Sequence, residues 1–160
     1  DVLFRNTEVA FKYKMPPVSA AIGLGQVERA EELVVRKREI FNWYHEALSE
    51  VNGVQLNHEP DNTKNSYWMV TAVLDPKLGW PKEKLMGALD KEGIDSRPMF
   101  YPLSSLSAYD RVFQSAMARD RNEVSYRITP WGINLPSALC LKKGQVQRVV
   151  DALIQILSAP

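Results

Sequence analysis

The sequence has one cysteine, no long apolar run and almost no excess of charge of either sign. Cys140 cannot form a disulfide within the chain, which favours a reducing, cytoplasmic compartment. No apolar stretch approaches the roughly 20 residues that a membrane-spanning helix needs. Twenty basic residues face nineteen acidic ones, so the basic surplus typical of nucleic-acid-binding proteins is missing. These absences predict a protein that neither crosses a membrane nor binds nucleic acid.

The motifs that mark common enzyme classes are also missing. The sequence contains no phosphate-binding loop, no dinucleotide-binding glycine pattern, no Gly-x-Ser-x-Gly and no His-Glu-x-x-His. His45 and His58 have no partner at metal-ligand spacing, so we expect structural or solvent-facing roles for them and no metal site. Cys140 has no neighbour that marks it as activated, and we expect it to pack as a small hydrophobic residue.

The strongest pattern that is present lies in the first third of the chain. Apolar residues spaced by three and four run from Val27 to Val51, which predicts a long amphipathic helix over residues 17–51. Gly23 and Gly25 interrupt its first part. They indicate either a bend or a place where another helix or a second subunit packs closely on bare backbone. The asparagine–glycine pair that follows supplies a stop signal.

The rest of the chain alternates helical and extended segments, which predicts an α+β fold with a small antiparallel sheet packed against helices. The composition, with 45% hydrophobic and 24% charged residues, is that of one globular domain. We predict an interdomain turn at 1–16, the long helix at 17–51 and a small α+β domain at 52–160, all one structural unit. Within the last part, the expected strands are 66–74, 94–97 and 133–136, and the expected helices are 81–89, 107–118 and 145–157.

Two segments could hold an anion. Phe11-Lys12-Tyr13-Lys14-Met15 places two lysines just before a helix start, where free N–H groups already favour a phosphate. The alternative is a solvated basic turn. In Arg97-Pro98-Met99-Phe100-Tyr101-Pro102-Leu103, two prolines restrict a stretch with an arginine and two aromatic rings, a combination suited to an anionic or sugar ligand. Here the alternative is a packed crossover loop.

Several ordered blocks of the sequence resemble the C-terminal half of the DegT/DnrJ/EryC1/StrS pyridoxal-phosphate sugar aminotransferases, and among them the perosamine synthase branch. The resemblance covers nearly the whole chain. The blocks are Lys-Tyr-Lys-Met at 12–15, Ala-Ala-Ile-Gly-Leu-Gly-Gln-Val-Glu-Arg at 20–29, Arg-Lys-Arg-Glu-Ile-Phe at 36–41, Asn-Ser-Tyr-Trp-Met-Val at 65–70, Arg-Pro at 97–98 with Tyr-Pro-Leu-Ser-Ser-Leu at 101–106, and Gly-Ile-Asn-Leu-Pro-Ser-Ala-Leu at 132–139.

This resemblance implies a transaminase that converts a nucleotide-linked 4-keto-6-deoxy sugar with pyridoxal phosphate. It also implies that the lysine forming the Schiff base lies in a large N-terminal domain upstream of this segment, so no lysine here takes that role. A Schiff-base lysine needs the cofactor's ring and phosphate held around it. We therefore expect no catalytic residue in this chain, and neither bound cofactor nor activity for the chain alone.

The resemblance also assigns binding residues. It implies that Lys12 reaches toward the cofactor phosphate of a partner subunit in a homodimer formed through the long helix. It implies that Arg97, Phe100 and Tyr101 lie against the nucleotide sugar, where a guanidinium could pair with the diphosphate. The alternative for Arg97 is an ion pair with a nearby carboxylate. The turn departs from the family pattern at four positions, which are Ala10, Phe11, Pro16 and Pro17.

Two interpretations of the function remain at this stage. In the first, the chain is a piece of a sugar aminotransferase that works only with its N-terminal half. In the second, it is a stand-alone α+β module that binds a protein partner or a ligand without chemistry. The reading frame upstream of Asp1 would separate them.

Overall fold

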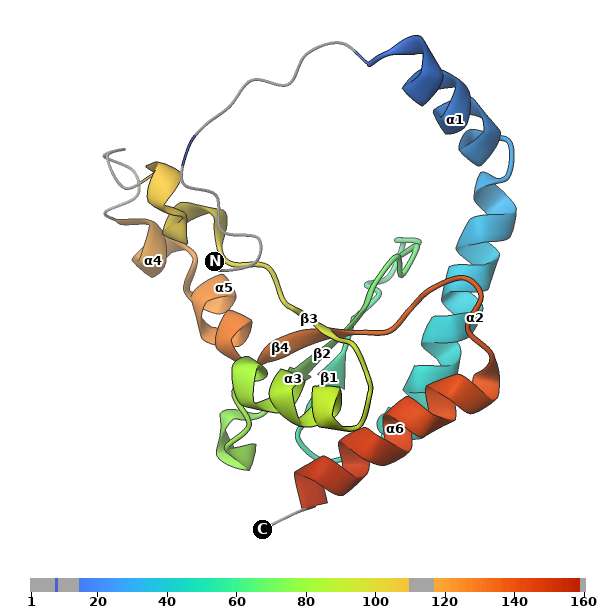
Figure 1. The fold of residues 1–160 in the computed structure, drawn as a ribbon. Helices are drawn as coiled ribbons and strands as arrows, with labels where there is room; N and C mark the ends of the chain where they lie inside the picture. Colours follow the sequence, from blue (N-terminus) through green and yellow to red (C-terminus); the bar gives the residue numbers. More distant parts are fainter. Residues whose placement is uncertain (1–7, 9–14, 110–116, 159–160) are drawn as a thin grey trace.

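The computed structural model describes residues 8, 15–109 and 117–158. Its centre is a four-stranded antiparallel sheet in the order β1-β2-β4-β3 (Figure 1). The strands are β1 (Val54–Leu56), β2 (Val70–Leu74), β3 (Arg97–Pro98) and β4 (Gly132–Leu135). The helices are α1 (Pro17–Val27), α2 (Ala30–Leu48), α3 (Lys82–Lys91), α4 (Ala118–Arg121), α5 (Glu123–Ile128) and α6 (Lys143–Ser158). The predicted α+β class is confirmed.

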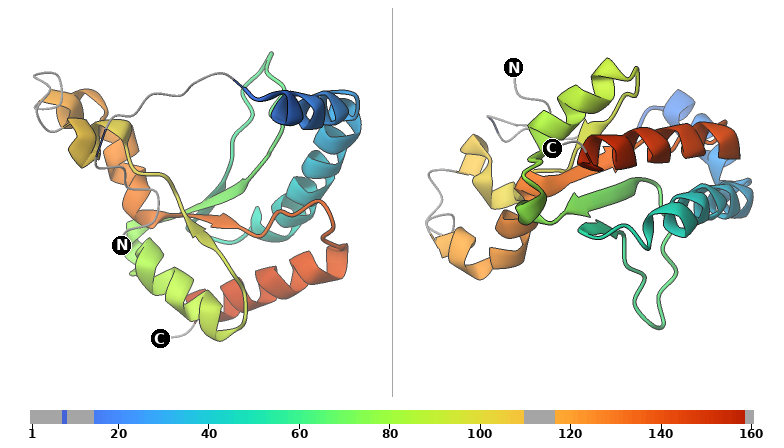
Figure 2. Two further views of the ribbon diagram at one scale, coloured as in Figure 1. Left: turned by 45° about the horizontal axis from the view of Figure 1, so that its top comes forward. Right: turned by 90° about the horizontal axis from the view of Figure 1, so that it is seen from below.

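The hydrophobic core lies between one face of the sheet and three helices. Residues that pair across antiparallel strands share a face, and β2 pairs with β4 so that Val70 faces Leu135 and Ala72 faces Ile133. These four side chains are buried in one cluster with apolar residues of α2, α3 and α6. Figure 2 shows α2 and α6 running beside the sheet. The opposite face of β4 is left for polar residues.

The predicted helix over 17–51 is divided. It breaks at Glu28 and Arg29, and α2 ends at Leu48. Arg29 takes a non-helical conformation (φ −109°, ψ 11°), and its N–H bonds back only three residues, to the Gln26 carbonyl. Gly25, in the last turn of α1, weakens the helix at this point. The apolar spacing continues across the break, so periodicity alone could not reveal it.

Helix α1 is not part of the core. None of its residues is buried, and Val18, Ile22, Leu24 and Val27 are each more than 60% exposed. In Figure 1 this helix stands apart from the sheet and from α6. An uncharged helix whose apolar residues are all exposed is typical of a segment that packs against another domain or subunit.

Other expectations met mixed outcomes. The strand predicted at 66–74 is shorter because Tyr67 has a positive φ of 48°, which ends extended pairing before Val70. The strand β1 was not predicted, and the return strand pairs only at its end, as β3. The helix predicted at 107–118 lies partly outside the described residues, and its beginning is a 3-10 turn, Ser107–Tyr109.

The expectation that Cys140 is packed was wrong. Its side chain is exposed, because it lies in the turn that leads into α6 rather than in a strand or helix. Among the helices of the described residues, none has the length and apolar character needed to span a bilayer. No group of three or more His, Cys, Asp or Glu side chains in the described segments could hold a metal ion.

Candidate functional site

The segment from Arg97 to Tyr101 is fixed to β4 by backbone contacts. Arg97 and Pro98 pair with Asn134 and Ile133, and the Met99 N–H donates to the Gly132 carbonyl at 2.9 Å. A side-chain methyl at Gly132 would come within 2.5 Å of the Met99 sulfur, so glycine permits this close packing. The backbone that carries the predicted ligand residues is therefore held against the sheet.

A row of polar side chains crosses the face of the sheet opposite the core. Thr71, Asn134 and Arg97 stand in register on β2, β4 and β3. Thr71 Oγ1 donates to Asn134 Oδ1 at 2.7 Å, and Asn134 Nδ2 donates to the Pro98 carbonyl at 3.2 Å. Asn134 is only 6% exposed, and these two bonds satisfy its buried amide. The row links the central strand to the segment that carries Arg97.

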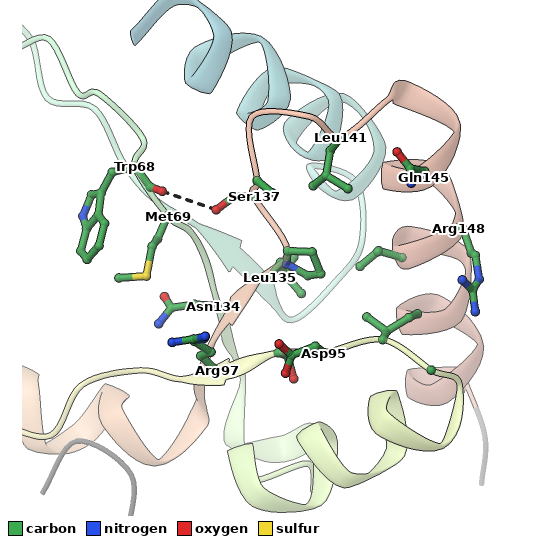
Figure 3. Close-up of a pocket in the computed structure, with 16 residues that line it drawn as sticks. Trp68, Met69, Asp95, Arg97, Asn134, Leu135, Ser137, Leu141, Gln145 and Arg148 are labelled. Carbon is green, nitrogen blue, oxygen red and sulfur yellow. Dashed lines mark hydrogen bonds between the residues drawn. The ribbon is translucent and has the colours of Figure 1, made fainter. Parts of the chain in front are cut away.

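Arg97 lines a cavity of about 610 Å³ between this face and the start of α6. Figure 3 shows its side chain beside Asn134, with Trp68 and Met69 on the neighbouring wall. A second guanidinium, of Arg148, also lines the cavity, but it donates to the Glu92 carbonyl at 2.8 Å. Among the described residues, Arg97 forms no ion pair and no side-chain hydrogen bond, so its guanidinium is available to a ligand.

Two aromatic rings form an exposed wall beside Arg97. Trp68 is 61% and Phe100 is 47% exposed, and their rings stack with centroids 6.4 Å apart at an angle of 22°. The backbone under Trp68 is fixed from both sides. Lys37 Nζ donates to the Trp68 carbonyl at 2.9 Å, and Tyr67, with its left-handed backbone, stacks flat on Phe41 at 3.6 Å. A tryptophan held this way offers a rigid apolar surface to a ligand.

Sequence reasoning did not select Trp68 as a site residue. Its place in an apolar run suggested a side chain packed against one face of the sheet. The signal that could have drawn attention to it was its position in the Asn-Ser-Tyr-Trp-Met-Val block, one of those on which the family resemblance rests. The left-handed backbone at Tyr67, which turns the chain here, leaves no trace in the residue pattern.

The structure separates the predicted ligand residues into two cavities. Arg97 lines the first, whereas Phe100 and Tyr101 line a second of about 410 Å³ that extends toward α5. The stack of Trp68 on Phe100 joins the two, because Trp68 borders the first cavity. The Tyr101 ring lies under the Lys82 ammonium, 3.9 Å from its centroid. Lys12 lies outside the described residues.

Three consecutive cations of α2 hold the loops around the cavity. Arg36 donates to the carbonyls of Leu139 and Leu141, and Lys37 to those of Trp68 and Ser137. Burial lowers the pKa of Lys37. The periodicity placed this lysine on the apolar face of the helix, and the structure shows why a lysine suits that position. Its side chain is half-buried, and its ammonium fastens two loops.

Arg38 fastens the loop before Tyr67. Its guanidinium bonds both carboxylate oxygens of Glu59, at 2.6 and 3.0 Å, and the Asn65 carbonyl at 2.6 Å. The hydrogen bonds from Arg38, with a further one from the Asn65 N–H, lower the pKa of Glu59 to about 2. The ionised carboxylate of Glu59 therefore fixes the loop, and protonation of this carboxylate in acid would weaken its bonds to Arg38.

Four cavities in the described part of the chain do not fit pyridoxal phosphate, because that cofactor needs a lysine whose ammonium enters the cavity and none of the four is lined by lysine. Close to the site, Lys37 and Lys82 are engaged by carbonyls and a ring. The site can recognise an anionic ligand with an apolar or aromatic part, and we derive no chemical step from these residues.

Comparison with known proteins gives a consistent result. Residues 2–154 match the family model described as the DegT/DnrJ/EryC1/StrS aminotransferase family. The GDP-perosamine synthase of Vibrio cholerae is 33% identical over 145 residues, which cover 91% of this chain and 38% of that protein. The chain therefore spans less than two fifths of this curated relative.

Two solved structures have a similar fold. Helicobacter pylori PseC, an aminotransferase involved in the biosynthesis of pseudoaminic acid, superposes with a TM-score of 0.76 at 18% identity, covering 92% of this chain and 39% of that one. The putative sugar aminotransferase Spr1654 from Streptococcus pneumoniae, in its PLP form, gives 0.76 at 20% identity, covering 92% and 37%.

Proposed function

This chain belongs to the DegT/DnrJ/EryC1/StrS aminotransferase family, and we propose that it is the C-terminal part of a transaminase acting on a nucleotide-linked 4-keto-6-deoxy sugar. The family is pyridoxal-phosphate-dependent. Support for the sugar class comes from the GDP-perosamine synthase among the relatives, which matches over most of this chain.

The observation that carries the proposal is the guanidinium of Arg97, which has no ion pair or side-chain hydrogen bond within the described residues, beside the stack of Trp68 on Phe100. A planar guanidinium binds two phosphate oxygens at once, and an aromatic wall suits the face of a base or a sugar ring. The cavity that Arg97 lines, at about 610 Å³, falls within the range of small-molecule sites. In this assignment Arg97 contacts the diphosphate, and the aromatic wall, extended by Tyr101, orients the rest of the ligand.

In this proposal the residues of this chain recognise the nucleotide sugar, and they do not include the lysine that reacts with the cofactor. The lysine would come from an N-terminal part that this segment lacks, so the chain alone would neither bind the cofactor covalently nor transfer an amino group. Lys12 would reach the cofactor phosphate of a second subunit, in a homodimer. The exposed apolar surface of α1 supports such an assembly, because a helix of this kind is costly to leave in water.

A comparison of two forms of the protein tests the proposal. The 160-residue chain and the product of the gene extended upstream of Asp1 are each incubated with pyridoxal phosphate, an amino donor and GDP- or TDP-linked 4-keto-6-deoxy sugars. We expect amination, detected by mass spectrometry, only with the extended form, and a borohydride-fixed lysine adduct only there. A specific adduct on a lysine of the 160-residue chain would contradict the proposal, as would an upstream frame that encodes no lysine-bearing domain.

A further inference from the structure

Lys82 is a buried lysine that the proposed function does not use. It is the first residue of α3 and is only 2% exposed. Its ammonium lies 3.9 Å from the centroid of the Tyr101 ring and 3.5 Å from the Met99 carbonyl oxygen. In the described part of the chain it forms no ion pair with a carboxylate. Burying an ammonium without a carboxylate partner costs free energy, so the contacts that Lys82 does make are expected to have a role.

The contacts of Lys82 complete the fixation of the segment from Arg97 to Tyr101. On the side of β4, this segment is held by Asn134 Nδ2, which donates to the Pro98 carbonyl, and by the Gly132 carbonyl, which accepts from the Met99 N–H. On the side of α3, Lys82 supplies a polar contact to the backbone and a cation–π contact to the ring. The segment is thus fastened from two sides, while the Arg97 guanidinium has no partner in the part of the chain that the structure describes.

We propose that Lys82 is a positioning residue for the nucleotide-sugar site, which sets the path of Met99 to Tyr101 and thereby the placement of Arg97 and Phe100. The inference rests on the proposed function and names a determinant of substrate affinity within it. It also adds a role for Tyr101, whose ring serves as the surface on which the ammonium rests.

The energetics favour a positioning role over simple stabilisation. Desolvation lowers the pKa of Lys82, and only the adjacent Glu83 opposes this effect. A methionine of similar length would fill the same space without that cost. What the ammonium adds is direction, since it prefers the face of the ring and the lone pair of one carbonyl. Losing that direction should shift the segment and not unfold the domain.

The test uses the extended protein and three variants. Lys82→Met removes the ammonium, Lys82→Arg restores a cation that can lie on the ring, and Lys84→Met is the matched control. Lys84 is on the same helix and also lies over an aromatic ring, 3.9 Å from the centroid of Trp80, but it is exposed and its ammonium donates to the Gly79 carbonyl, away from the site. KM and kcat for the nucleotide sugar are measured with thermal stability and hydrogen exchange of the peptide 97–103.

We expect Lys82→Met to raise KM about tenfold with kcat within about twofold, because a small misplacement of binding groups weakens binding strongly. Lys82→Arg should recover most of the loss, and Lys84→Met should change neither constant. Exchange in 97–103 should be faster in Lys82→Met alone. An unchanged KM, or a lower melting temperature with KM intact, would overturn the proposal. If the wild-type protein aminates no nucleotide sugar, the proposed function is refuted instead, and the exchange of 97–103 still decides whether Lys82 fixes the segment.

Discussion

Asn134 joins the two halves of the site, and its replacement gives the most quantitative prediction. Asn134→Ala removes the part-buried bond from Thr71 Oγ1 and the buried bond to the Pro98 carbonyl. Each lost bond costs about 1 kcal/mol, and each partner left unsatisfied can cost more, so we expect the free energy of unfolding to fall by about 2–4 kcal/mol.

Thr71→Val provides the matched control. It keeps the shape of the side chain and removes only the first of the two bonds, so it should cost about 1 kcal/mol and leave the Pro98 contact in place. The double variant should show a coupling energy of about 1 kcal/mol between the two sites, measured by urea unfolding followed by tryptophan fluorescence. Because Asn134 bonds the segment that carries Arg97, whereas the Thr71 side chain bonds Asn134, ligand affinity should fall in Asn134→Ala and not in Thr71→Val. A loss below about 0.5 kcal/mol in Asn134→Ala, or no coupling, would refute the reasoning.

Three further predictions concern a loop, a helix and a glycine. Glu59 has a folded pKa of about 2 against an ordinary value of 4.5, so it stabilises the fold fully above pH 4.5 and loses this effect as the pH falls toward 2. The melting-temperature advantage of the wild type over Glu59→Gln should therefore shrink across that interval; a constant difference would show that the carboxylate is not linked to folding. The isolated chain should self-associate through α1, as measured by light scattering over a tenfold concentration range. The double variant Ile22→Ser and Val27→Ser should associate more weakly, and a monomeric wild type would contradict the prediction. Gly132→Ala should destabilise by about 1–3 kcal/mol, because the new methyl meets Met99, and wild-type-like stability would show that Met99 relaxes freely.

The elements that local patterns specify were predictable. The last helix and the short helix after Pro81 follow from apolar spacing and flanking stop signals, and both are found as α6 and α3. The break between α1 and α2 was not predictable in this way, because the apolar spacing runs through it. The left-handed backbone at Tyr67 was not predictable for a related reason. It depends on stacking with Phe41, which is a contact between distant segments, as well as on a local bond from the Tyr67 N–H to the side chain of Asn65.

The candidate site divides along the same line. The segment with Arg97 and two aromatic residues could be identified because arginine, proline and aromatic residues lie close in sequence. That Arg97 has no ion pair with any described residue, by contrast, depends on where Asp95 and the carboxylates of other segments lie in space. Trp68 and Lys82 come from distant parts of the chain, and only the folded sheet and α3 bring them to the segment. Spacing along one sequence carries no signal for such encounters.

The role of Arg97 is the central claim, and one measurement tests it most directly. Arg97→Lys keeps the charge and loses the geometry that lets a guanidinium bind two oxygens at once. The control is Arg148→Lys, because the Arg148 guanidinium lines the same cavity but already donates to the Glu92 carbonyl. In the extended protein we expect Arg97→Lys to raise KM for the nucleotide sugar by about tenfold or more, with a melting temperature within about 2 °C of the wild type, and Arg148→Lys to leave KM unchanged. A lower melting temperature with an unchanged KM in Arg97→Lys would make Arg97 a structural residue and contradict the assignment.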